Sequence, residues 1–178
     1  GINSSQGKNL IGTYYQPDFV LNDVSILKSL PQREMISGYG EILKHSLILD
    51  RKFFFWLSKN GKKIINKKNN TLLTNAIVKS CKIKSKIVDK EEQEKKLRMI
   101  LNFGHTFAHG FEGAKNFSKK LNHGEAVILG MMVASELSNK KKLLSFKELS
   151  LIKKHYNSLK LSTSIKKVFK KNEINKVV

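Results

Sequence analysis

Four strongly polar side chains recur in one apolar stretch, spaced three or four residues apart: Arg98, Asn102, His105 and His109. On an α-helix, at about 100° per residue, they would fall within an arc of roughly 60°. Two imidazoles four residues apart can converge on a metal or a substrate from adjacent turns. The alternative is a pair of core histidines bonded to backbone carbonyls. A cation and an amide on the same arc favour the functional interpretation.

Three further residues carry chemistry by type and position. His123 opens an apolar run after Asn122. Glu41 lies in an apolar stretch with Lys44 three residues later, a spacing that is usually a surface ion pair. Lys84 falls inside an apolar helical stripe, where an ammonium either meets an anion or extends to the helix edge. His45 and His155 carry no such signal, and we treat both as ordinary residues.

Composition limits the class of protein. The 178 residues are 40% hydrophobic, enough for one good core or two small ones. No apolar run is long enough to span a membrane. The single cysteine, Cys81, excludes an intramolecular disulfide and fits a reducing compartment, so we expect a cytoplasmic protein. The start Gly-Ile-Asn has neither Met nor a signal-peptide pattern, which suggests that the chain begins inside a larger protein.

The net charge of +20 raises the question of nucleic acid binding. Only Arg33, Arg51 and Arg98 among the 34 basic residues are arginines, whereas base and phosphate recognition usually also draws on the arginine fork. The lysines are scattered in pairs and triples. We therefore interpret the excess as surface composition that attracts anionic substrates, and we expect no specific nucleic acid partner.

Periodicity and capping residues predict a mainly α fold after a short N-terminal extended segment. We expect loop and turn over Gly7–Pro17, a short strand over Phe19–Asp23, and a charged break over Asp89–Lys96. The expected helices run from a Ser29 cap through Glu41 to Leu49, from about Phe53 to a stop at Gly61, from Asn69–Thr71 along the stripe Leu73 to Val88, through Arg98 to His109, from His123 to Ser138, and from Phe146 through Tyr156.

Several separated stretches resemble the 3-dehydroquinate synthase family of sugar phosphate cyclases. They are G-K-N-L-I-G-T-Y-Y-Q-P, L-P-Q-R-E-M-I-S-G-Y-G-E-I-L-K-H-S-L-I, L-R-M-I-L-N-F-G-H-T-F-A-H-G-F-E and L-N-H-G-E-A-V-I-L-G-M. They occur in the family's order, from the first residue to about Ser138. The resemblance implies a helical bundle domain (29–178) of an α/β plus α enzyme, preceded by a remnant of the nucleotide-binding domain (1–28).

The resemblance also implies roles for individual residues. The family's metal ligands fall on Glu41, His105 and His123. Positions that contact substrate or take part in proton movement fall on Lys44, Lys84, Arg98, Asn102 and His109. Lys8 matches a lysine near the nucleotide and Asn9 an asparagine near the substrate. A turn that packs against the nicotinamide cofactor matches Ile26, Leu27, Lys28 and Ser29.

The implied reaction converts a seven-carbon keto-acid phosphate, 3-deoxy-D-arabino-heptulosonate 7-phosphate, to 3-dehydroquinate and phosphate in the shikimate pathway. It implies NAD, one zinc or cobalt ion and a homodimer. The chain departs from the family in lacking any glycine-rich nucleotide-binding turn, and Ser4, Ser5 and Gln6 replace the usual His-Pro-type stretch. We therefore expect residues 1–178 alone to fold and bind metal without turning over substrate.

Other classes of protein stay open at this point. Another sugar phosphate cyclase fits the same motifs. A metal-dependent polyol dehydrogenase also uses imidazoles four apart, but would not need Lys44, Lys84 and Arg98 around a neutral alcohol. A non-enzymatic, polyanion-binding helical module would explain the charge alone.

Overall fold

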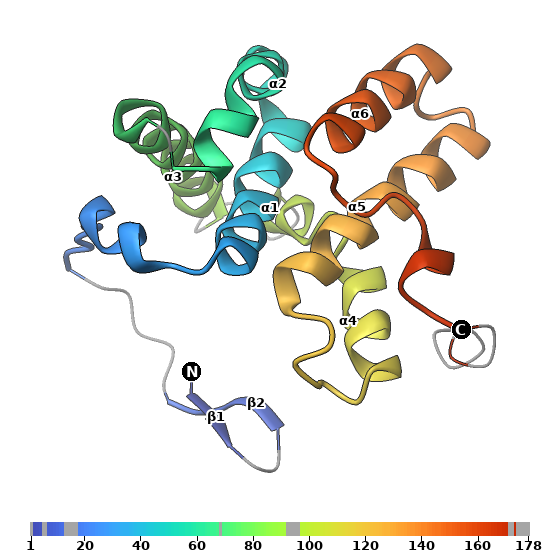
Figure 1. Ribbon diagram of the computed structural model, residues 1–178, viewed down its shortest axis with the longest axis horizontal. Coiled ribbons are helices and arrows are strands. Elements are labelled where there is room, and N and C mark those ends of the chain that lie inside the picture. Colours follow the sequence, from blue (N-terminus) through green and yellow to red (C-terminus); the bar gives the residue numbers. More distant parts are fainter. Residues whose placement is uncertain are drawn as a thin grey trace.

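The computed structural model describes residues 2–4, 7–12, 18–67, 69–91, 97–170 and 173. Helices form most of this part of the chain, and a small hairpin lies at its N-terminal end (Figure 1). In chain order the elements are β1 (Ile2–Ser4), β2 (Gly7–Ile11), the 3-10 helix η1 (Val24–Ser29), α1 (Gln32–Leu49), α2 (Arg51–Ile65), α3 (Asn70–Glu91), the 3-10 helix η2 (Leu97–Asn102), α4 (His105–Ala114), α5 (His123–Lys140), α6 (Phe146–Ser158) and the 3-10 helix η3 (Ile165–Lys167). The predicted mainly α fold with a short extended N-terminal segment is confirmed.

The N-terminal region differs from the expectation in two places. Gly7–Ile11, expected as loop, forms β2 and pairs antiparallel with β1. Of the rest of that expected loop, Gly12 is described and has no regular structure, and residues 13–17 lie outside the described residues. Phe19–Asp23 has no regular structure, and Phe19, Val20 and Leu21 are exposed. The predicted strand there is wrong because, within the described chain, the sheet holds only β1 and β2, so the segment has no strand to pair with.

Two helix boundaries were also predicted wrongly. Ser29 does not cap α1; its hydroxyl donates to the Ile26 carbonyl at 3.1 Å and closes η1, while α1 begins after Pro31. Gly61 does not end α2, which continues to Ile65. A Cβ at Gly61 would lie 2.6 Å from the Tyr39 hydroxyl, so this glycine serves close packing between α1 and α2. The expected Asn69 cap of α3 is present, accepting from the Leu72 amide at 2.9 Å.

The stretch from Arg98 to His109 is not one continuous α-helix, which corrects the expected single polar stripe. It consists of η2 and α4, separated by Gly104 in the left-handed region at φ 82°. A 3-10 helix turns about 120° per residue and the glycine redirects the chain, so the helical-wheel argument holds only within α4. His105 and His109 do share α4, whereas Arg98 and Asn102 belong to η2.

Gly104 permits a close contact between α4 and α5. A Cβ on Gly104 would lie 2.7 Å from the Met131 backbone nitrogen, and one on Gly130 would lie 2.2 Å from the Gly104 carbonyl oxygen. Only glycines allow backbones to approach this closely. The start of α4 is therefore fixed against the middle of α5.

The core surrounds α5, which lies between α4 and α6 and beside α1 (Figure 1). Seven consecutive α5 residues, Ala126 to Met132, are buried, so the middle of this helix is enclosed on all sides. Two buried hydroxyls tie α6 to its neighbours: Tyr156 donates to the Ile128 carbonyl at 3.0 Å, and Tyr39 lies 3.0 Å from Nε2 of His155. None of the described helices has the length and apolar character that crossing a membrane requires.

Candidate metal centre

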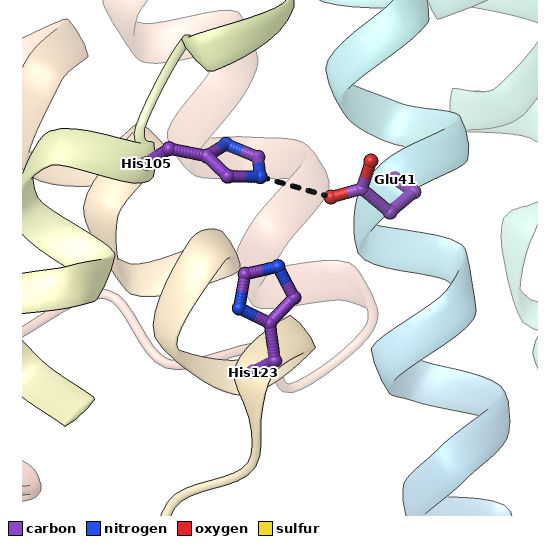
Figure 2. A group of neighbouring side chains, drawn as sticks. All are labelled: Glu41, His105 and His123. Carbon is purple, nitrogen blue, oxygen red and sulfur yellow. Dashed lines mark ion pairs between the residues drawn. The ribbon is translucent and has the colours of Figure 1, made fainter. Parts of the chain in front are cut away.

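Glu41, His105 and His123 converge from three helices, α1, α4 and α5 (Figure 2). One ligand atom from each lies within 4.8 Å of the other two. Oε1 of Glu41 is 3.7 Å from Nε2 of His105, and the two imidazole centroids are 5.3 Å apart. Zinc bonds to nitrogen and oxygen are about 2.0–2.2 Å long, so small side-chain rotations bring all three atoms within reach of one ion.

Both histidines are the first residues of their helices, where the backbone is well fixed. His105 follows the Gly104 turn that packs on α5. His123 follows Asn122, whose side chain accepts from the Glu125 amide at 2.9 Å while the Glu125 carboxylate accepts from the Asn122 amide at 3.0 Å. This reciprocal capping box fixes the helix start. The two imidazoles therefore project from rigid positions.

Glu41 has one carboxylate oxygen with a hydrogen bond and one without. Oε2 accepts from the Lys44 ammonium at 2.6 Å, and Lys44 is only 4% exposed. Burial raises the pKa of Glu41, but the hydrogen bond and charge of Lys44 outweigh it, so the pKa lies below its usual value. Oε1 is buried without a hydrogen bond. An ionised carboxylate with an orphaned buried oxygen fits a metal ligand, because an ion would satisfy that oxygen.

His105 has the protonation state that a ligand needs. Burial lowers the pKa of His105, and the Lys44 charge lowers it further, so the ring is neutral near pH 7. Its Nδ1 faces the Phe103 carbonyl at 3.5 Å, which favours the proton on Nδ1. The Nε2 lone pair then points at Glu41, and a neutral imidazole is the form that binds metals.

His109 lies at the edge of this cluster. Its ring centroid is 5.9 Å from that of His105 and 6.3 Å from that of His123, and its side chain is exposed. It borders the three predicted ligands without belonging to the set whose atoms converge. An exposed imidazole beside a metal can exchange protons with a ligand or solvent.

The remaining predicted substrate residues lie on neighbouring elements. Lys84 is exposed on α3, which agrees with the alternative in which its ammonium extends to the helix edge. Its charge reaches His45, whose pKa burial and Lys44 lower to about 4. Arg98 and Asn102 are exposed on η2, and Asn102 lines a groove of about 670 Å³ that contains none of the three converging residues.

The predicted cofactor residues are placed only in part. Lys8 and Asn9 lie in β2, and their side chains are outside the described residues. Ile26, Leu27, Lys28 and Ser29 form most of η1. Together with Leu73 and Ile77 of α3, the η1 residues Ile26 and Leu27 line a groove of about 410 Å³ that is mostly apolar. NAD contact at these residues stays a prediction.

Two polar residues near the cluster were not predicted from the sequence. Glu112 is buried on α4, and its Oε2 lies 3.2 Å from Nδ1 of His123. Arg33 on α1 binds the Glu125 carboxylate next to His123. Glu112 could have been found, because it is seven residues after His105 and so shares its helix face. Arg33 could not, because its partners are distant in the sequence. His45 and His155, which we treat as ordinary residues, are buried.

The fold has close counterparts among solved enzymes. It is similar to ValA, the 2-epi-5-epi-valiolone synthase of Streptomyces hygroscopicus solved with NAD+ and Zn2+, with a TM-score of 0.82 and 27% identity over 99% of this chain and 49% of that one. It is also similar to a 2-deoxy-scyllo-inosose synthase complexed with carbaglucose-6-phosphate, NAD+ and Co2+, with a TM-score of 0.81 and 28% identity over 98% of this chain and 47% of that one. The fold is thus that of the helical domain of sugar phosphate cyclases.

Sequence comparisons narrow this class. The C-terminal model of 3-dehydroquinate synthase matches residues 38–178, and the N-terminal model matches residues 1–37. The 3-dehydroquinate synthase of Pelagibacter ubique is 53% identical over all 178 residues, and that of Bartonella tribocorum is 44% identical over 94% of the chain. The chain belongs to the 3-dehydroquinate synthase family. It spans about half the length of these curated relatives, 48% and 44% respectively.

Proposed function

We propose that this chain is the metal- and substrate-binding part of a 3-dehydroquinate synthase, which converts 3-deoxy-D-arabino-heptulosonate 7-phosphate to 3-dehydroquinate and phosphate. The observation that carries the proposal is the convergence of Glu41, His105 and His123 around a buried, unsatisfied carboxylate oxygen, in a chain of this family. Such an enzyme is a phosphate-eliminating lyase that serves aromatic amino acid biosynthesis.

The proposed ligands suit a catalytic ion rather than a structural one. One carboxylate and two imidazoles leave coordination positions open for a substrate, whereas structural zinc sites fill all four positions with side chains. When bound, a zinc or cobalt ion would supply a Lewis acid that lowers the pKa of a substrate hydroxyl. ValA is solved with Zn2+ and the inosose synthase with Co2+, which supports either metal here.

The chain's own residues would bind and orient an anionic substrate around this centre. Lys44 holds Glu41 ionised and adds positive charge beside it. Arg98 and Lys84 are exposed cations on η2 and α3, which we assign to the carboxylate or phosphate of the substrate, and Arg98 carries a two-point fork. We assign Asn102 to orienting a hydroxyl and His109 to moving protons at neutral pH.

The cofactor assignment rests on the relatives. Both solved cyclases contain NAD+, and we propose that NAD contacts Lys8 and the turn Ile26–Ser29, with Asn9 near the substrate. A homodimer in the cytoplasm is the arrangement that we expect. A second candidate function is another sugar phosphate cyclase reaction. ValA and the inosose synthase share the fold but are synthases of other products.

Phosphate release from defined substrates tests the proposal. A protein with the full length of the relatives, containing these residues, is loaded with NAD and zinc or cobalt. We expect phosphate release from the seven-carbon keto-acid phosphate and none from a six-carbon sugar phosphate. Release from the six-carbon substrate alone would establish the second candidate, and release from neither by the loaded protein would contradict both.

A further inference from the structure

Glu112 is a buried acid beside a proposed metal ligand. It lies on α4 and is 3% exposed, and its Oε2 is 3.2 Å from Nδ1 of His123. Acidic side chains are almost never fully buried unless they are paired. The carboxylate is therefore held inside the fold at a defined place, and the imidazole of His123 is one of its partners.

The His123 ring is oriented with one nitrogen towards Glu112 and the other towards the proposed metal ligands. The ring has two nitrogens, and Nδ1 faces Glu112. Figure 2 shows the other nitrogen facing the space between Glu41 and His105. A carboxylate that accepts from Nδ1–H keeps the proton on that nitrogen and leaves the lone pair on Nε2, directed into the cluster. The same hydrogen bond makes the imidazole a stronger donor to a metal.

The position of Glu112 follows from the architecture of α4. This helix begins at His105 and carries Glu112 seven residues later, which is about two turns along the same face. One helix thus supplies His105 and, through Glu112, restrains His123 on α5. The Gly104 contact with α5 fixes the two helices against each other.

We propose that Glu112 is a positioning residue that sets the tautomer and orientation of His123 and thereby strengthens metal binding at the cluster. This inference rests on the proposed function, in which His123 is a metal ligand. Glu112 itself is not placed among the ligands, because the converging atoms come from Glu41, His105 and His123.

Metal affinity measured against a chromogenic chelator tests the proposal. Losing such a carboxylate partner typically weakens metal affinity about 10- to 100-fold, and we expect this loss for zinc in Glu112→Ala. Glu112→Gln keeps an oxygen that can accept from Nδ1–H, so we expect a smaller loss. The matched control is Glu136→Gln on α5, which removes an exposed carboxylate that pairs with Lys153 of α6 and should leave the zinc affinity unchanged.

A second measurement needs no substitution and no metal. In the wild-type chain, ¹⁵N NMR of the histidine rings should show His123 protonated on Nδ1. Protonation of neutral His123 on Nε2, or zinc affinity of folded Glu112→Ala equal to wild type, would overturn the positioning role while leaving the metal site intact. Failure of the wild type to bind zinc would instead overturn the metal site itself.

Discussion

Arg33 of α1 forms a bidentate ion pair with Glu125 of α5, and this pair connects the helix of Glu41 to the helix of His123. Its Nε donates to Oε1 at 2.7 Å, and its Nη2 donates to Oε2. The same side chain donates to the Lys119 carbonyl at 2.7 Å, just before α5. Glu125 lies two residues after His123 and forms the capping box with Asn122, so this fork connects α1 to the start of α5.

Replacing this fork by a point charge should loosen the cluster. Arg33→Lys keeps the charge but cannot span both oxygens and the carbonyl, so we expect a loss of about 0.5–1.5 kcal/mol in the free energy of unfolding and weaker metal binding. Arg51→Lys is the control, because Arg51 makes a more exposed ion pair with Glu148 away from the cluster. Urea unfolding and chelator competition measure both effects. Equal changes in unfolding free energy and metal affinity in the two variants would argue against a special role of the Arg33–Glu125 pair.

A methyl group at Gly104 should displace the start of α4. The residue has φ 82°, and an added Cβ would overlap the Met131 backbone, so Gly104→Ala should destabilise the fold by about 2–4 kcal/mol and weaken metal binding through His105. Gly113→Ala lies in the same helix with open space around its Cβ. This control should stabilise the helix by about 0.5–1 kcal/mol. Thermal unfolding distinguishes them, and similar behaviour of the two would refute the packing argument.

The buried His155 should make the fold sensitive to acid. Burial lowers the pKa of His155 from 6.5 to about 4, where its ring faces the Tyr39 hydroxyl. Between pH 6.5 and about pH 4, His155 therefore binds a proton in the unfolded chain but not in the folded chain. The contribution to stability is complete above about pH 6.5 and is lost as the pH falls towards about 4, a change of about 3 kcal/mol at 1.36 kcal/mol per pKa unit.

Substitution of the histidine isolates this effect. His155→Gln lacks the titrating group, so its unfolding free energy should fall less between pH 7 and pH 5 than that of the wild type. His45 has a pKa lowered to about 4 in the same direction, and part of the acid sensitivity should therefore remain in the variant. Urea unfolding at both pH values measures the difference. An identical pH dependence in the two proteins would exclude His155 as a source.

These features show what the sequence could and could not predict. His105 and His109 were recognisable from spacing within one helix, a local property. The convergence of His105 and His123 with Glu41, which lies 64 residues before His105, follows from the family resemblance, because spacing says nothing of contacts between distant helices. The break in the helix at Gly104 could not be predicted, because the apolar periodicity continues across it. The sequence leaves Lys84 open between an anion contact and extension to the helix edge, because a stripe does not reveal where a helix face reaches solvent.

The binding of the substrate anion by Arg98 is a further prediction for the full-length enzyme. Arg98→Ala should weaken transition-state binding, measured as kcat/KM, by roughly 2–5 kcal/mol, the range for breaking a charge pair that the bound substrate desolvates, and Arg98→Lys should recover only part. The lysine variant tests geometry, because it retains the charge without the fork. Steady-state phosphate release gives kcat/KM for the wild type, Arg98→Ala and Arg98→Lys. Normal efficiency of Arg98→Ala would remove Arg98 from the substrate site.

The central claim is that Glu41, His105 and His123 hold one divalent ion, and metal stoichiometry tests it most directly. Wild type and the three single alanine variants are loaded with zinc or cobalt, freed of excess ion, and analysed for bound metal, with the exposed Glu136→Ala as a control. We predict one equivalent in the wild type and in the control, and much less in each ligand variant. A full equivalent retained by folded His105→Ala or His123→Ala would contradict the assignment.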